Sequence, residues 1–327
     1  MNIYEIAEKA GVSIATVSRV LNNSPSVSEK TRKKVLQIIE EDHYHPNAFA
    51  RGLMLDSMKT VGVICTDVGD LFIAQTLSLL QAELRTRNYD PLLFCVGSNQ
   101  QTTTKHLRYL QSKHVDAIFL IGSTFSDTTD KAQLSQIARD IPVIMINGSI
   151  DAPGVYSVCS DDAEATARVT NLLIQKQLTH CVMLYDSMTQ GTKRKIQGFQ
   201  KGLAQNGITL AEEQVVFSGQ TLQSSMQIVE DLIKKGRCPD GVIATSDLLA
   251  AGAIQAFHNH GLQCPVVGFD NTVLCECVSP RLTSIDLHME QACRMAAEIL
   301  DQLMAKQPVS QQHTCPAEII WRESFEK

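Results

Sequence analysis

The 327-residue sequence lacks several features that would place it in other classes of protein. It has no run of about eighteen apolar residues, so we expect no membrane span. Its first residues, "MNIYEIAEKAG", include acidic side chains and no apolar stretch, which excludes a secretory signal. We therefore expect a globular protein of the cytoplasm with two or three domains.

The ten cysteines do not follow the pattern of a disulfide scaffold or of a metal site. Most are dispersed in apolar, strand-like runs, such as Cys65 in "VGVICTD" and Cys181 in "HCVMLYD", which is typical of buried thiols in a reducing compartment. The tightest pair, Cys275 and Cys277, lacks the spacing and the second pair that a zinc site requires. We expect no bound metal and no cofactor.

The sequence also lacks the motifs of common enzyme classes. G-x-x-x-x-G-K-S/T, H-E-x-x-H and G-x-S-x-G are all absent. Asp247 and Asp270 are candidates for a carboxylate pair, but binding of ligand hydroxyls explains them with fewer assumptions. We expect no catalytic residues.

Net charge is −6, which by itself argues against binding of nucleic acid. The charge is unevenly distributed, because residues 1–60 carry +1 and the remainder carries −7. The segment "KTRKK" at 30–34 concentrates cations, although such a run is also typical of a solvated helix face.

The first sixty residues have the pattern of three short helices. Asn2, with Glu5 three residues later, forms a start similar to a capping box, and Gly11 ends the first helix. Ser13 and Ser28 are the expected N-caps of the second and third helices. Two helices joined by a short turn containing glycine, with a third that closes the core, form a helix-turn-helix unit.

The second of these helices has an outer face that suits contact with base edges. Ile14 and Ala15 lie at its start and Arg19 lies one turn later. Short apolar side chains contact thymine methyl groups, and arginine pairs bidentately with guanine. The alternative is a small helical subdomain without a role in DNA binding.

The segment "IYEIAEKAGVSIATVSRVLNNSPSVSEKTRKKVLQIIEEDHYHPNAFARGL" closely resembles the DNA-binding headpiece of the lactose-repressor/galactose-repressor (LacI/GalR) family. "AGVS-ATVSRVLN" and "PN-FARGL" match the family signature almost letter for letter. The resemblance implies an all-α headpiece over 1–45 and a hinge helix with linker over 46–59. The implied DNA-binding residues are Ile14, Ala15 and Arg19 for bases, Ser13, Thr16, Ser18 and Asn22 mainly for phosphates, and Asn47 and Leu53 in the hinge.

The hinge segment "HPNAFARGLML", from 45 to 55, has helical apolar spacing but is too short to be a stable helix alone. In the family, two such helices pair at the centre of the operator, and each inserts a leucine into the minor groove. Here that leucine would be Leu53. The alternative is that Leu53 packs on Phe49 or on its own domain.

From Thr60 onward, apolar strand candidates alternate with helical patterns, which predicts an α/β fold with parallel sheets. The strands form two series of similar spacing, which begin near 60, 91, 117 and 142 and near 180, 215, 241 and 265. "LTSIDL" at 282–287 leads into a helix whose late position indicates a return to the first series, and "AEIIWRES" is expected as a final strand. We expect one lobe over 60–159 plus 288–317, and a second over 160–287 plus 318–327.

This arrangement resembles a periplasmic-binding-protein-like effector domain of two doubly wound lobes, and the resemblance covers essentially all of 60–327. Ligands of open α/β sheets bind at the carboxyl ends of strands, and two lobes can close around a small molecule by hinge motion. Hydroxyls and acceptors dominate the predicted strand ends, which suits a polyhydroxylated ligand. These residues are Asp67, Ser123, Thr124, Asn147, Asp186, Ser246, Asp247, Asp270 and Asn271.

The segment "DSMTQGTKRKIQGF", 186–199, lies between a strand and a helix, so we expect Lys193, Arg194 and Lys195 in the first helical turn. Cations there interact unfavourably with the helix dipole, and an anion bound at that end would offset this cost. The alternative is three solvated cations. Relatives commonly place an effector-contacting arginine at the position of Lys195, and lysine does not reproduce the bidentate contact.

Further departures from the family concern Thr221, where several relatives have an aromatic residue that stacks on the ligand, and Ser246, where asparagine is frequent. Phe72 matches an aromatic cleft position, with a core role as the alternative. Asp270 follows a buried strand, with helix capping as the alternative. The expected effector-binding residues are Phe72, Ser123, Asn147, Arg194, Lys195, Thr221, Asp247 and Asp270.

The combined expectation is a sequence-specific DNA-binding repressor of carbohydrate-utilisation genes. Its effector would be a sugar, a sugar acid or a sugar phosphate, and its partners operator DNA and a second copy of the chain. The sequence ends at "WRESFEK" without heptads for a tetramer, so a homodimer is expected. The alternative is a carbohydrate-binding protein or sugar-active enzyme without a DNA role; a transport-binding protein would lack the headpiece.

Overall fold

The computed structural model describes residues 3–21, 24–42 and 57–325, in two compact units that comprise Met1–Met58 and Lys59–Lys327. Three of the predicted DNA-binding residues, Asn22, Asn47 and Leu53, lie outside the described residues, as does most of the predicted hinge. In the described part of the chain, no helix has the length and hydropathy to cross a membrane.

The first unit contains three helices, α1 (Ile3–Ala10), α2 (Ile14–Leu21) and α3 (Glu29–Glu41). Local chemistry sets their ends as predicted. Gly11 ends α1 with φ of +64°, a conformation that glycine adopts without strain. The hydroxyls of Ser13 and Ser28 accept hydrogen bonds from the Thr16 and Thr31 backbone N–H groups at 3.2 and 3.3 Å. The three helices close over a small core of Ile6, Ala7, Ala10, Val17, Val20 and Val35.

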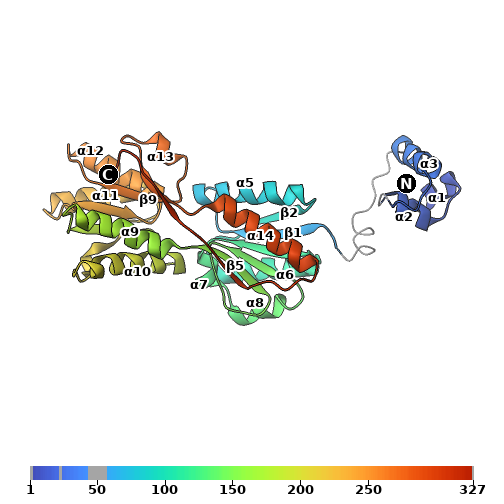
Figure 1. Cartoon of the computed structure of the whole chain (residues 1–327), viewed down its shortest axis with the longest axis horizontal. Coiled ribbons are helices and arrows are strands. Elements are labelled where there is room, and N and C mark those ends of the chain that lie inside the picture. The colour runs from blue at the N-terminus through green and yellow to red at the C-terminus, as the bar shows by residue number, and fades with distance from the viewer. Residues whose placement is uncertain (1–2, 22–23, 43–56, 326–327) are drawn as a thin grey trace. The chain divides into compact units, whose positions relative to one another are not determined.

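The second unit contains two six-stranded sheets, one in each lobe (Figure 1). The first lobe has the strand order β2-β1-β3-β4-β5-β11, all parallel. Its strands are β1 (Thr60–Cys65), β2 (Asp90–Cys95), β3 (Ala117–Ile121), β4 (Val143–Ile146), β5 (Val155–Ser160) and β11 (Gln312–Cys315). Its helices are α5 (Leu71–Thr86), α6 (Gln100–Ser112), α7 (Thr124–Thr128), α8 (Lys131–Ile137) and α14 (Met289–Met304).

The second lobe repeats this order as β7-β6-β8-β9-β10-β12, with β12 antiparallel to β10. Its strands are β6 (Cys181–Tyr185), β7 (Val215–Phe217), β8 (Gly241–Ala244), β9 (Val266–Phe269), β10 (Thr283–Asp286) and β12 (Glu318–Ile320). Its helices are α9 (Asp162–Gln175), α10 (Gln190–Gln205), α11 (Leu222–Lys234), α12 (Asp247–Asn259) and α13 (Leu274–Cys277), with a 3₁₀ turn at Glu212–Gln214. Both orders are doubly wound, as the sequence predicts.

The chain crosses between the lobes three times, after β5, after β10 and between β11 and β12. The late helix α14 therefore returns to the first lobe, where it lies beside α5 (Figure 1). Three strands, β5, β10 and β11, are additions to the strands named from the sequence. The residue bounds expected for the two lobes stay our proposal.

Helix α10, which carries part of the site, packs closely against α9 at two glycine residues. A Cβ atom at Gly198 would lie 2.1 Å from the carbonyl oxygen of Ala163, and one at Gly202 would lie 2.5 Å from the Thr170 side chain. Because no larger residue fits at these two positions, the helices approach closely and the start of α10 is fixed relative to the sheet.

Candidate functional site

A cavity of about 130 Å³ lies where polar side chains of both lobes meet. Its main contributors lie within two residues of the end of a strand, which is where open α/β sheets bind ligands. From the first lobe these are Thr66, Ser123 and Asn147, and from the second lobe Asp186, Thr245 and Asp270. The remaining lining residues are Asp70, Phe72, Ile73, Gly122, Thr124, Asp162, Ser187, Thr189, Gly191, Thr192, Lys195 and Ser246.

A larger cavity, of about 700 Å³, lies on the second lobe between α9 and the C-terminal segment that carries Trp321 and Phe325. Its lining comes from one lobe, and it does not lie at the carboxyl ends of the strands. We therefore place the ligand site in the smaller cavity, where acceptors and hydroxyls of two lobes converge.

Five of the eight predicted effector-binding residues line this cavity: Phe72, Ser123, Asn147, Lys195 and Asp270. Ser123 also joins the lobes, because its hydroxyl donates to Thr189 Oγ1 at 3.1 Å. Lys195 is only 8% exposed. Its Nζ donates to the carbonyl oxygen of Thr245 at 2.8 Å and lies 3.9 Å from the centroid of the Phe269 ring.

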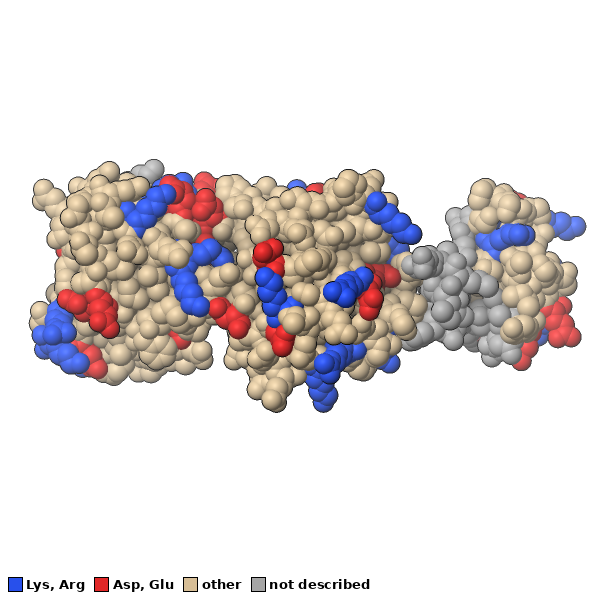
Figure 2. Space-filling view, turned by 90° about the horizontal axis from the view of Figure 1, so that it is seen from below, with Lys and Arg blue, Asp and Glu red and all other residues tan. Residues whose placement is uncertain are grey.

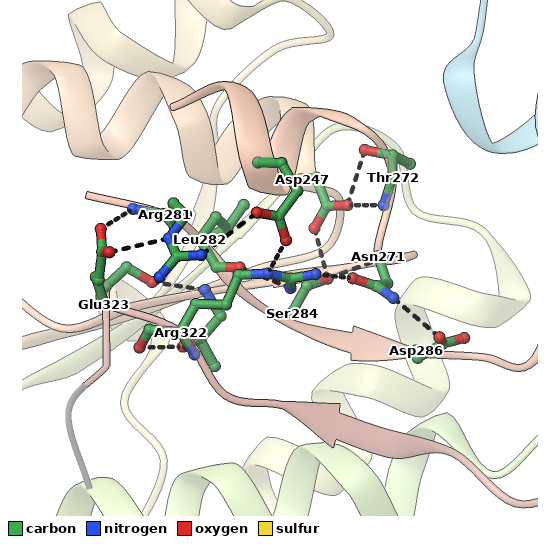
Figure 3. A network of polar contacts seen from close by, with 12 residues as sticks. Asp247, Asn271, Thr272, Arg281, Leu282, Ser284, Asp286, Arg322 and Glu323 are labelled. Atoms are coloured by element: carbon green, nitrogen blue, oxygen red, sulfur yellow. Dashed lines mark hydrogen bonds and ion pairs between the residues drawn. The ribbon is translucent and has the colours of Figure 1, made fainter. Parts of the chain in front are cut away.

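Asp247, the sixth predicted residue, does not line the cavity, which differs from the sequence prediction. It belongs instead to a network of polar contacts (Figure 3). Its side chain is 1% exposed, and both carboxylate oxygens already accept hydrogen bonds. Ser284 Oγ donates at 2.6 Å, and the Thr272 N–H and hydroxyl donate at 2.6 and 2.9 Å. Burial raises the pKa of Asp247, and these hydrogen bonds oppose that effect. Asp247 therefore anchors the start of α12 to the neighbouring strand ends.

The same network extends from the loop after β9 to a crossing between the lobes (Figure 3). Asn271, which follows Asp270, donates from Nδ2 to Asp286 at 2.9 Å and accepts from Arg322 Nη2 at 2.9 Å. Asp286 in turn accepts from the backbone N–H of His288, at 2.7 Å, where the chain enters α14. Two hydrogen bonds therefore connect the loop after β9 to this crossing.

The three cations of α10 also differ in part from the prediction. The helix begins at Gln190, so Lys193 ends its first turn as predicted, whereas Arg194 and Lys195 lie in the second turn. Lys193 and Arg194 pair with carboxylates of the protein. Lys193 Nζ lies 2.9 Å from Asp127 Oδ1. Arg194 donates to both oxygens of Asp162 at 3.0 and 3.2 Å. Asp162 lines this cavity, whereas Arg194 does not.

The N-terminus of α10 already binds a carboxylate, and that carboxylate comes from the other lobe. Asp127 in α7 accepts a hydrogen bond from the Gln190 N–H at 2.6 Å through its second oxygen. The anion that the sequence predicts at this helix end is therefore Asp127 in this structure. Thr221, the last predicted effector residue, is exposed and caps α11 outside the cavity.

Several cavity residues were not singled out from the sequence. Asp70 is the N-cap of α5, accepting from the Ile73 N–H at 3.0 Å, and Thr245 is the first residue after β8. Asp162 reaches the cavity from the first turn of α9. A capping signal at Asp70 was readable, but it does not indicate that the side chain also lines a cavity.

In the first unit, the outer face of α2 carries the predicted base-contacting side chains. Ala15 and Arg19 are exposed, whereas Ile14 is half-buried and packs in part against the core of the unit. On the face of the second unit shown in Figure 2, Lys and Arg side chains are interspersed with Asp and Glu. DNA backbones are bound by clustered cations, which this face does not present.

Residues 2–47 match the model of bacterial regulatory proteins of the lacI family, and residues 170–325 match that of a periplasmic binding protein-like domain. An HTH-type transcriptional regulator of Lachnoclostridium phytofermentans is 37% identical over 99% of each chain. The lac repressor dimer bound to operator and the anti-inducer ONPF shares 22% identity over 99% of this chain and 98% of its own, with a TM-score of 0.88. The transcriptional regulator CelR in complex with cellobiose shares 23% over 99% and 100%, with a TM-score of 0.71.

Proposed function

The chain belongs to the LacI family of bacterial regulatory proteins, and we propose that it represses carbohydrate-utilisation genes. It is a DNA-binding transcriptional regulator rather than an enzyme. In our proposal it acts in the cytoplasm as a homodimer on a pseudo-palindromic operator, because the two-fold symmetry of a dimer is mirrored in such a site. A small sugar-like molecule bound between the lobes controls it.

The observation that carries this proposal is the polar cavity between the lobes. Hydroxyl, amide and carboxylate groups from both lobes converge there, as hydrogen bonding to a polyhydroxylated ligand requires. A protein of similar fold, CelR, is bound to cellobiose, which supports a sugar as the class of ligand. At about 130 Å³, the cavity favours a single sugar ring over a longer oligosaccharide.

We propose that α2 enters the major groove and that Ala15 and Arg19 read bases, since both side chains are exposed on one face. Ser13 and Thr16 form the helix cap, with their hydroxyls 2.9 Å apart. Their position at the helix start suits contact with phosphates.

Effector binding then changes DNA affinity by changing the relative position of the lobes. Only a ligand with different affinities for the two arrangements produces such a shift. The Asn271–Asp286 hydrogen bond supports a route from the loop after β9 to the crossing at His288. We propose that the sugar releases the operator.

The test is binding of the full chain to a library of palindromic DNA duplexes at two salt concentrations. We expect salt-sensitive binding, and Arg19→Ala should weaken the selected site by about 10- to 100-fold and relax base preference at one position. Arg108→Ala, an exposed arginine on α6, is the matched control and should bind normally. Absence of salt-sensitive binding, or full affinity in Arg19→Ala, would contradict the proposal.

A further inference from the structure

The cavity between the lobes has an unusual charge balance. Its charged lining residues are four carboxylates and a single cation, namely Asp70, Asp162, Asp186, Asp270 and Lys195. Asp162 is neutralised by its two hydrogen bonds from Arg194. Three carboxylates remain for one ammonium group.

Lys195 offsets only part of this excess. Its Nζ is held by the Thr245 carbonyl and the face of the Phe269 ring, and its side chain is almost fully buried. Burial raises the pKa of Asp270 to about 8; Lys195 lowers it, while Asp247, Asp70 and Asp186 raise it further. Asp270 therefore holds a proton at neutral pH in the ligand-free protein, and a cation bound beside it would favour its ionised form.

The carboxylates also keep acceptor capacity that the protein does not use. Asp70 accepts from the Ile73 N–H through Oδ1, and Asp186 accepts from the Ser187 hydroxyl through Oδ1, so each keeps its Oδ2 atom. The Asp270 carboxylate accepts no hydrogen bond from any described residue.

A further polar group of the cavity is Thr245. The residue is 6% exposed, it lines the cavity, and its hydroxyl has no hydrogen-bond partner within the described residues. Buried hydroxyls in native proteins are normally paired, so Thr245 keeps hydrogen-bonding capacity that a bound ligand can use.

A bound cation would compensate the negative charge of the cavity, but the arrangement of these side chains does not suit a metal ion. In residues 3–21, 24–42 and 57–325, no group of three or more His, Cys, Asp or Glu side chains is placed to hold one. A negatively charged ligand would add to the negative charge, and a neutral one would leave it in place. An ammonium group donates up to three hydrogen bonds to carboxylates and offsets their charge.

We propose that the effector is a protonated amine that also carries hydroxyl groups, as an amino sugar does, rather than a sugar acid or a sugar phosphate. This inference rests on the proposed function in assuming that the effector binds between the lobes. In this arrangement Asp186 and Asp270 accept from the ammonium group. Asp70 accepts from a hydroxyl of the ring, and the Thr245 hydroxyl accepts from or donates to another.

The test is calorimetric titration of the full chain at pH 6.5 with matched hexoses. The probes are glucose, glucosamine, N-acetylglucosamine and gluconate, and galactose with galactosamine. We expect one amino hexose to bind at least tenfold more tightly than its neutral parent, and gluconate not to bind. Asp186→Asn should reduce the preference to less than threefold, while Asp151→Asn, an exposed carboxylate outside the cavity, should leave it intact.

Equal or tighter binding of the neutral parent or of gluconate would overturn the inference, as would absence of binding by both amines. A preference that survives in Asp186→Asn would also overturn it. These outcomes are separable from failure of the proposed function. Release of operator DNA by a neutral sugar would uphold the regulator and reject the amine, whereas a chain that binds no operator would reject the regulator and leave the titration to decide the ligand.

Discussion

The two lobes share one strand order but supply different chemistry to the cavity. The first lobe contributes hydroxyls, an amide and the Phe72 ring, with Asp70 as its one charged group in the described lining. The second lobe contributes Asp186, Asp270 and Lys195. The topology places a side chain after each strand in both lobes, but the residue found there decides what it binds. We therefore expect substitutions in the second lobe to alter the stability of the protein and its preference for the charge of the ligand. Substitutions in the first lobe should alter the contact between the two lobes.

The largest effect is expected from Arg194→Ala in the second lobe. The substitution leaves Asp162, whose side chain is 2% exposed, without its cation. Removing one partner of a buried ion pair is strongly destabilising, so we expect a loss of about 3 kcal/mol in the free energy of unfolding. Urea denaturation of the two proteins measures it.

The control is the double variant Asp162→Asn with Arg194→Ala, which removes both charges and should recover a large part of the loss. The matched exposed cation is Lys193: Lys193→Ala should cost at most about 1 kcal/mol, because its pair with Asp127 is solvent-accessible. If Arg194→Ala instead unfolds normally but loses ligand affinity, then Arg194 contacts the effector as the sequence predicts.

This pair also shows what the sequence could and could not predict. The caps at Ser13 and Ser28 and the turn at Gly11 depend on residues within three positions, and all three predictions are confirmed. The partner of Arg194 lies 32 residues away on α9. No local pattern specifies that distance, so the sequence could not show that Arg194 pairs with Asp162 within the protein.

The strands also differ in how well the sequence predicts them. Long apolar runs predicted β1, β3 and β8, because buried parallel strands are apolar along their whole length. Strand β11, with the sequence "QHTC", has little such signal and pairs only with β5 at the edge of the sheet. Asp247 and Asp270 both follow strands, so spacing alone could not show that one is enclosed by donors and the other lines the cavity.

A smaller effect is expected in the pH dependence of stability, and it arises from Asp270 in the second lobe. Burial raises the pKa of Asp270 to about 8, and the pKa in the unfolded chain is close to the ordinary 3.9. Between these values the folded ligand-free protein binds more protons than the unfolded chain, so this residue makes stability fall as pH rises from about 4 to 8. Asp270→Asn removes that contribution.

Urea denaturation of wild type and Asp270→Asn at pH 5, 6, 7 and 8 tests this point. The variant should gain stability relative to wild type as pH rises, with a flatter profile across the window. Asn147→Ala, a neutral first-lobe residue in the same cavity, should keep the wild-type slope. Parallel profiles for wild type and Asp270→Asn would show that the carboxylate does not titrate in this range.

The smallest effect on stability, and the most local one, is expected from Asp127→Ala in the first lobe. Asp127 binds the start of α10 through the Gln190 N–H and Lys193, so it is one of the contacts by which the first lobe holds the second. The pair is partly exposed, and we expect a loss of only about 0.5–1 kcal/mol in unfolding. Because the contact crosses between lobes, we expect faster hydrogen exchange in the peptide 186–199 of the ligand-free protein.

Glu164→Ala is the matched control, since the Glu164–Lys201 pair also anchors α10 at 2.6 Å but lies within the second lobe. If both variants accelerate exchange equally, Asp127 merely caps a helix; if Asp127→Ala alone does so, the first lobe acts on the second through this carboxylate.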